Sequence, residues 1–132
     1  MYNYVKKTPD YLLYISKENE ICIQDIPIQK FFNDLLKLEL ADLYSREKTT
    51  KKVLKFKSKV PIYIDKSTMF MCLKSYRLEN SLYINYFSIT SYTYINDFVM
   101  INFQNKHTMK LNKKNAFQNQ MKKCLLILSY IN

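Results

Sequence analysis

The chain has 132 residues, no glycine, and 21 basic against 11 acidic side chains, which gives a formal net charge of +10. Hydrophobic residues make up 48% of it, so we expect one folded domain over residues 1–132 rather than a disordered tail. The lack of glycine excludes dinucleotide fingerprints, P-loops and kinase glycine loops, which need positive φ or backbone close to phosphate. It also predicts turns made of Asn, Asp, Ser and proline, and helices without the usual glycine at their ends.

The N-terminal third is predicted to be a hairpin followed by a helix. Residues 11–15 and 20–24 are apolar runs on either side of a polar turn at 17–19, which is typical of a β-hairpin. Pro27 suits the first turn of a helix, where its fixed φ and missing N–H are tolerated. Apolar residues then recur at helical spacing, and we expect one helix over about residues 28–44.

The middle of the chain has the pattern of β-strands. Lysine and apolar side chains alternate over residues 51–59, which predicts a strand with one basic and one apolar face. Extended chain is expected at 62–64 and at 68–73. After a polar stretch at 74–81, residues 82–95 are rich in Tyr, Ile, Phe and Thr, which favour strands.

The C-terminal part is predicted to hold another hairpin and a helix. Apolar side chains alternate along residues 99–103 and 107–111, on either side of a turn at 104–106. Asn115 is a candidate cap for a helix whose apolar face runs from Phe117 to Leu128. The predicted fold class is therefore α+β, with a mainly antiparallel, curled sheet that closes against the last helix like a pleckstrin-type partial barrel.

Candidate catalytic residues are few. His107 is the only histidine, and it lies where an inward-facing strand residue is expected, which favours a structural role. It could form a nucleophilic pair with Cys72, but no third group is identifiable to orient the pair. The three cysteines form no C-x-x-C pair, which argues against a zinc site or a disulfide framework. We therefore expect no enzyme activity, no metal and no cofactor.

The positive charge is concentrated after residue 45. Residues 1–45 have a net charge of −2, whereas residues 46–132 have a net charge of +12 and contain no acid after Asp97. The codons of an A/T-rich genome would enrich lysine, but they do not explain why acidic residues are so much fewer than basic ones. The asymmetry favours nucleic acid as a partner over an acidic protein or simple solubility.

No segment predicts a secretory leader or a membrane span. Lys6 and Lys7 are followed by a proline and an acid instead of an apolar region. The apolar run from Cys124 to Leu128 is far too short to cross a bilayer. We therefore expect a reduced, cytoplasmic protein without a membrane partner.

The densest basic segment lies between residues 46 and 59, where seven basic side chains accompany one acid, Glu47. Alternate lysines on the predicted strand would stand about 6.6 Å apart, in a row able to follow a phosphate backbone. Such contacts give affinity and salt dependence rather than base discrimination, and they suit narrow AT-rich minor grooves. The alternatives are a solvated strand face or an edge strand protected by lysines. The candidate DNA-binding residues are Arg46, Lys48, Lys51, Lys52, Lys55, Lys57 and Lys59, with Lys113 and Lys114 as supplementary contacts.

Four tyrosines form a second, weaker candidate site. Tyr83, Tyr86, Tyr92 and Tyr94 could stack unpaired bases, as aromatic residues of single-strand binders do. Tyrosines in strands more often pack against their neighbours, and packing is the favoured interpretation.

Several segments, in order, resemble the competence transcription factor ComK family. Residues 59–65 (KVPIYID) resemble its K-P-P-I-x-[VI]-D stretch, and residues 83–84 (YI) resemble its W-I strand. Residues 101–111 (INFQNKHTMKL) are similar to its V-x-F-x-N-G-x-x-[ML]-x-L hairpin. Residues 115–120 (NAFQNQ) are similar to its N-S-F-x-N-Q helix start, and residues 43–46 are a weaker match to its Y-x-x-R-K turn.

The resemblance covers about residues 28–125 and implies a bacterial activator of competence genes. Such proteins bind AT-rich boxes through the minor groove, bend the DNA and assemble on it as oligomers. This chain departs from the family pattern at Tyr83, where the family has tryptophan, at Lys106, where it has the hairpin glycine, and near 45–49, where it has turn glycines. No family DNA-contact residue carries over, so the candidate site depends on charge alone.

Longer family members carry a tail beyond the terminal helix, linked to activation and to adaptor-directed proteolysis. We expect this chain to lack that tail. Contacts with RNA polymerase or with a proteolytic adaptor, which the tail would make, are therefore in doubt for this chain. Two functions remain open. The first is a regulator that grips AT-rich double-stranded DNA, as a homo-oligomer, through lysines between residues 46 and 59. The alternative is a degenerate interaction module that does not bind DNA and modulates a full-length relative or another acidic partner.

Overall fold

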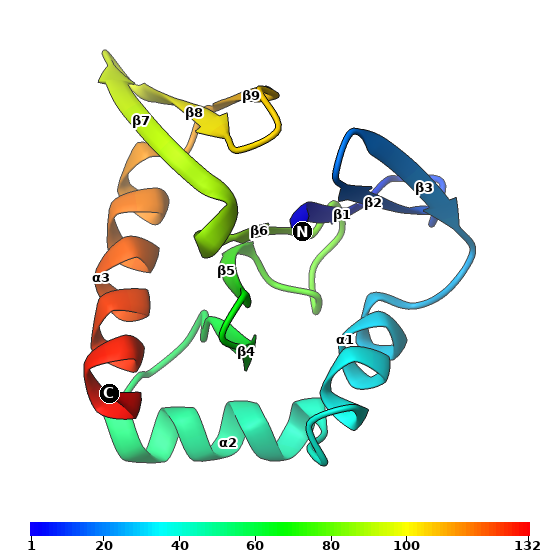
Figure 1. The fold of residues 1–132 in the computed structure, drawn as a ribbon, viewed down its shortest axis with the longest axis vertical. Coiled ribbons are helices and arrows are strands. Elements are labelled where there is room, and N and C mark those ends of the chain that lie inside the picture. The colour runs from blue at the N-terminus through cyan, green and yellow to red at the C-terminus, as the bar shows by residue number, and fades with distance from the viewer.

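A computed structural model describes all of residues 1–132 as two antiparallel sheets and three α-helices (Figure 1). In chain order the elements are β1 (Tyr2–Lys7), β2 (Leu13–Lys17), β3 (Glu20–Gln24), α1 (Ile28–Lys37), α2 (Leu43–Leu54), β4 (Ile62–Asp65), β5 (Thr68–Lys74), β6 (Leu82–Asn85), the 3₁₀ turn η1 (Tyr86–Ser88), β7 (Ile89–Ile95), β8 (Phe98–Phe103), β9 (Thr108–Leu111) and α3 (Lys114–Ile131).

Six strands form one sheet in the order β3-β2-β1-β6-β5-β4, and the other three form a second sheet in the order β7-β8-β9. Every strand pair in both sheets is antiparallel. The predicted α+β class and the mainly antiparallel pairing are therefore confirmed. Both sheets are open and form no closed barrel, which is consistent with the predicted fold class.

The six-stranded sheet has a hydrophobic core on each face. On one face α1 packs through Phe32, whose ring centroid lies 4.8 Å from that of Tyr83. On the other face α3 and β8 pack through Phe117 and Ile101, against Met71 of β5. Alternate residues of β5 serve the two cores, which explains why its sequence is a continuous apolar run.

The single helix predicted over residues 28–44 is wrong, because the structure has two helices there. The first ends at Lys37, after which Leu40 adopts a left-handed conformation with φ 58°. The Ala41 N–H donates to the Leu36 carbonyl at 3.0 Å, which is the helix-ending pattern in which the left-handed position is usually glycine. Asp42 then caps α2 by accepting a hydrogen bond from the Ser45 N–H at 2.9 Å.

The strand predicted over residues 51–59 is also wrong. Helix α2 continues to Leu54, and Lys55 ends it in a left-handed conformation with φ 60°. Residues 55–61 are irregular, and the next strand begins only at Ile62. Because Leu43 and Leu54 pack inward at helical spacing, burial favours a helix over the strand suggested by the lysines.

Left-handed turns occur without glycine throughout the chain, and mostly on residue types other than the Asn, Asp and Ser that the sequence predicts. Asn80 and Asn96 fit the expectation that asparagine would replace glycine. The other residues with positive φ are Tyr11, Glu18, Leu40, Lys55, Lys59 and Lys106.

The predicted hairpins are confirmed, with small shifts in their ends. The first is β2–β3, and the last is β8–β9 with its turn at residues 104–107. His107 lies outside β9 and is exposed, so its expected inward position is wrong. Asn115 does not cap α3, because that helix already begins at Lys114 and has no side-chain cap.

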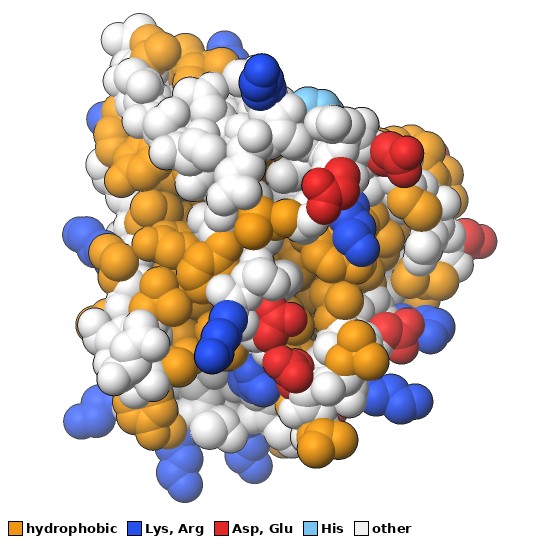
Figure 2. All heavy atoms as spheres, viewed as in Figure 1, with side chains coloured by type: hydrophobic (Ala, Val, Ile, Leu, Met, Phe, Trp, Pro, Cys, Tyr) orange, Lys and Arg blue, Asp and Glu red, His pale blue; other side chains and the backbone are white.

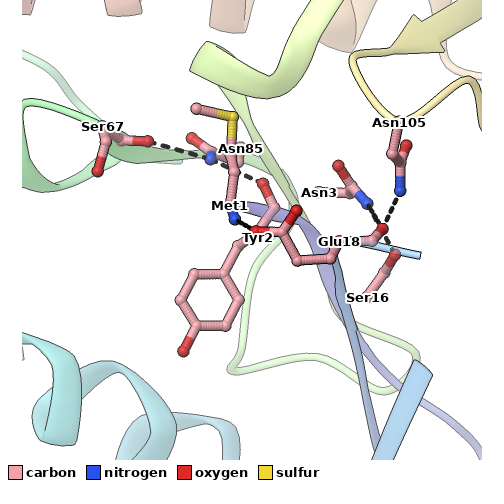
Figure 3. A network of polar contacts seen from close by, with 8 residues as sticks. All are labelled: Met1, Tyr2, Asn3, Ser16, Glu18, Ser67, Asn85 and Asn105. Atoms are coloured by element: carbon pink, nitrogen blue, oxygen red, sulfur yellow. Dashed lines mark hydrogen bonds and ion pairs between the residues drawn. The ribbon is translucent and has the colours of Figure 1, made fainter. Parts of the chain in front are cut away.

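A polar network ties the first hairpin to both sheets (Figure 3). The Met1 amino group forms an ion pair with Glu18 in the β2–β3 turn, and the Asn105 side chain donates to the Glu18 carbonyl. Asn85 donates to the Tyr2 carbonyl at 2.8 Å. The turn of the hairpin is therefore anchored from β1 and from the β8–β9 turn.

Candidate nucleic-acid interface

Helix α2 and the residue that ends it carry four exposed lysines. Lys48, Lys51 and Lys52 are spaced i, i+3 and i+4, which places them on the same side of the helix, and Lys55 follows as its left-handed C-cap residue. All four are exposed, and we call them the α2 lysine face. The helix rises 1.5 Å per residue, so they extend over about 10 Å along its axis.

The opposite side of α2 fixes the helix to the sheet and to both other helices (Figure 1). Leu43 is buried in the core beneath α1, and Leu54 packs against the core beneath α3. Glu47 accepts a hydrogen bond from the Tyr76 hydroxyl at 2.5 Å. The lysines are thus carried by a helix that is held at both ends and in the middle.

No carboxylate neutralises the α2 lysine face. The structure has two ion pairs, Met1 with Glu18 and Lys30 with Asp34, and neither involves α2. The only acid within α2 is Glu47, which accepts a hydrogen bond from Tyr76 and lines the same cleft as Lys51 without forming an ion pair. Lys51 and Lys52 lie in the last turn, where they also offset the partial negative charge of the helix C-terminus.

Arg46 lies apart from the α2 lysine face. Its guanidinium donates to the Tyr63 carbonyl on β4 and lies 5.8 Å from the centre of the Tyr63 ring. The side chain is half-buried. The structure therefore places Arg46 where it anchors α2 to the sheet edge, and its contact with DNA stays a prediction.

A second group of lysines lies on the α3 side. Lys123 donates to the Ser58 carbonyl at 2.6 Å and so holds the irregular segment after α2 against α3. Lys113 stands close enough to Lys59 and Lys74 to be repelled by both. Burial, followed by this repulsion, lowers the pKa of the Lys113 ammonium group. We call Lys59, Lys74 and Lys113 the α3-side lysine cluster.

One cleft joins the two groups of lysines. It has a volume of about 310 Å³, and its basic lining residues are Lys51 from α2, Lys59 and Arg77. Cys72 and Tyr83 line it from the sheet, where burial raises the pKa of the Cys72 thiol. Sequence reasoning missed Lys74 and Arg77, because only the fold brings them beside residues that lie far away along the chain.

The remaining candidates are dispersed. Lys57 is exposed on the irregular segment, and the Lys114 ammonium group lies 5.4 Å from the centre of the Tyr94 ring. Tyr83 is only 1% exposed and is part of the core, so it cannot stack a base. Tyr92 packs edge-on against Phe117, with ring centroids 5.2 Å apart.

Figure 2 shows basic side chains on several margins of one face of the molecule and also beside acidic side chains in its centre. Basic side chains project from the lower margin, where α2 runs in Figure 1. The acidic side chains visible there lie in the centre and the right half.

No group of three or more His, Cys, Asp or Glu side chains could hold a metal ion. None of the helices has the length and apolar character needed to span a bilayer.

Open antiparallel sheets with an unpaired lysine face on a fixed helix define a small α+β protein with a surface suited to polyanions. A family model described as ComK protein matches residues 4–132. The chain therefore belongs to the ComK family, whose members are competence transcription factors. The match extends the resemblance found in the sequence to the N-terminal strands. Comparison with curated proteins and with solved structures finds no match.

Proposed function

We propose that this chain regulates transcription of competence genes by binding AT-rich duplex DNA through the α2 lysine face. The observation that carries the proposal is the α2 lysine face itself, four exposed lysines on a fixed helix and at its end, with no carboxylate partner. Family membership supports the regulatory role. The choice of AT-rich DNA rests on the resemblance and on the preference of basic side chains for narrow minor grooves.

Lysine contacts would supply affinity in this complex more than base reading. Each ammonium group that neutralises a phosphate releases condensed counterions, which makes binding steeply dependent on salt. Lysine is a flexible point charge, so it does not read guanine edges with the two-pronged geometry of arginine. Sequence preference would then come from the shape and deformability of the DNA.

The cleft beside α2 suggests how a second set of phosphates is contacted. Each group of lysines contributes one residue to its lining, Lys51 from the α2 lysine face and Lys59 from the α3-side lysine cluster. A duplex lying on α2 would bring its neighbouring backbone toward the cluster. In this arrangement Arg46 and Glu47 position α2 through Tyr63 and Tyr76.

Fluorescence anisotropy of a labelled AT-rich duplex tests the proposal. The variant K48Q/K51Q/K55Q removes three charges from the α2 lysine face, and the matched control K6Q/K17Q/K66Q removes three exposed charges elsewhere. We expect the first variant to lose about tenfold or more in affinity at constant salt and the control to change it much less. A GC-rich duplex of equal length should bind more weakly to the unmodified chain.

Equal losses in the two variants would contradict the placement of the site. Absence of any binding by the unmodified chain at low salt would contradict DNA binding itself and would favour the interaction module.

A further inference from the structure

Strand β3 leaves one edge of the six-stranded sheet free. It pairs only with β2, and no element lies beyond it in the sheet order (Figure 1). The other edge, β4, is covered by α2. The β3 sequence, Glu20-Ile-Cys-Ile-Gln24, contains none of the lysines, prolines or bulges that usually protect an edge strand.

The β2–β3 register determines which backbone groups of this edge are unpaired. Lys17 lies opposite Glu20 on either side of a two-residue turn, so this pair is hydrogen-bonded, as is Ile15 with Cys22. The N–H and C=O groups of Ile21 and Ile23 consequently point away from β2. No backbone hydrogen bond elsewhere in the structure uses them.

Among the side chains of β3, Gln24 donates to the Cys22 Sγ at 3.5 Å, and no side chain of the strand forms a hydrogen bond with another element. Ile21 and Ile23 are each 52% exposed and share one face of the sheet. Cys22 points to the other face and is exposed, whereas Cys72 and Cys124 are buried. The hairpin is anchored at its turn through Glu18 (Figure 3), which gives the free edge a defined position.

We propose that β3 is an interface between two copies of this chain, which pair antiparallel about a two-fold axis at Cys22. In this pairing Ile21 of each copy lies opposite Ile23 of the other, and their outward N–H and C=O groups exchange hydrogen bonds. Cys22 lies opposite its own symmetry mate at a non-hydrogen-bonded position, where Cα atoms are about 4.5 Å apart. The two sheets become one continuous sheet.

The strand is complementary to itself in charge and shape. Glu20 of one copy lies opposite the neutral Gln24 of the other, so no like charges meet. The four isoleucines form one apolar patch across the axis, and the small cysteine accommodates the close central pair. These pairings all arise when β3 pairs with another β3 about an axis at Cys22. We therefore take a second copy of this chain as the partner of the edge. The proposal is independent of DNA binding, since the pairing is tested without DNA.

Thiol cross-linking of the full chain tests the register. Diamide takes up the two hydrogens of two thiols, which join as a disulfide, and is itself reduced to the hydrazine. We expect rapid formation of a dimer linked through Cys22, because opposed Cα atoms at this separation fit a disulfide. In C22A/I21C the only exposed thiol faces an isoleucine, so cross-linking should be about tenfold slower. Equal rates for the two proteins would overturn the register.

Sedimentation velocity over a concentration series tests the interface without any cross-link. The unmodified chain should shift from monomer to dimer as its concentration rises. I21K/I23K places lysines opposite one another across the axis, and it should stay monomeric with an unchanged circular dichroism spectrum. A dimer that persists in I21K/I23K, or an unmodified chain that remains monomeric at its highest soluble concentration, would overturn the proposal.

Discussion

Gln120 of α3 accepts a hydrogen bond from the main-chain N–H of Cys72 on β5, with an Oε1–N distance of 2.7 Å. Its Nε2 donates to the Lys59 carbonyl at 2.7 Å, and the side chain is only 1% exposed. The Gln120 amide thus provides a hydrogen-bond partner for a backbone N–H of β5 that β4 does not reach. It also holds the segment between α2 and β4 against α3. The position of Lys59 beside the cleft depends on this link.

Replacing Gln120 by leucine should therefore destabilise the protein. Q120L leaves the buried Cys72 N–H without a partner and leaves the Lys59 carbonyl with only the 3.3 Å hydrogen bond from Lys123, which lowers the free energy of unfolding by about 1–3 kcal/mol. Urea denaturation measures this change. The neighbouring Asn119 is exposed, so N119L should stay within about 0.5 kcal/mol of the unmodified chain. A Q120L midpoint equal to that of N119L would show that the two hydrogen bonds contribute nothing to stability.

Glycine at the two helix ends should stabilise the fold. Leu40 is 98% exposed and has φ 58°, a conformation that costs a residue with a Cβ about 1–2 kcal/mol. L40G is expected to raise the free energy of unfolding by about 1 kcal/mol. E39G, at a neighbouring position without positive φ, should lower it instead. Thermal unfolding of the two variants compares them directly, and stabilisation by both or by neither would contradict the role of backbone conformation.

Lys55 combines that strain with the proposed function. K55G should stabilise the protein for the same reason as L40G, since Lys55 has φ 60°. It also removes one charge from the α2 lysine face and should weaken DNA binding. Opposite changes in stability and affinity would separate the two roles of this residue. An unchanged affinity would remove Lys55 from the interface.

Tyr76 makes stability sensitive to alkaline pH. Burial, followed by the hydrogen bond and the negative charge of Glu47, raises the pKa of Tyr76 from 10.0 to about 12. The unfolded chain then loses this proton before the folded chain does. The contribution to stability is complete below pH 10 and is lost as the pH rises toward about 12.

Urea denaturation at a series of alkaline pH values measures this loss. Y76F should show a shallower decline than the unmodified chain. Part of the decline should remain, because burial also raises the pKa of Tyr83. Tyr130 is 65% exposed, and Y130F should keep the full decline. A Y76F curve parallel to that of the unmodified chain would contradict the assignment.

The fold was predictable where periodicity and burial agree. The alternation of Val99, Ile101 and Phe103 predicts β8, and all three side chains are buried in the structure. The α1–α2 boundary was not predictable in this way, because the turn uses Leu40 where a glycine or asparagine would have marked it. The cap at Asp42 was the available signal.

The candidate site was predictable in composition but not in geometry. Charge density identified the lysines of α2, yet the alternation between Lys55 and Lys59 suggested a strand. Only two apolar residues of α2, Leu43 and Leu54, pack into the cores, so its helical pattern is weak. Lys74 and Lys113 approach Lys59 through tertiary contacts, which no local pattern encodes.

The salt dependence of DNA binding tests the central claim most directly. The logarithm of the binding constant should fall linearly with the logarithm of salt concentration, with a slope of about −0.9 for each phosphate contacted. If the lysines of α2 contact phosphates, K48Q/K51Q/K55Q should reduce the slope by up to about 2.7, and K6Q/K17Q/K66Q should leave it unchanged. A slope that is the same in all three proteins would contradict binding through the α2 lysine face.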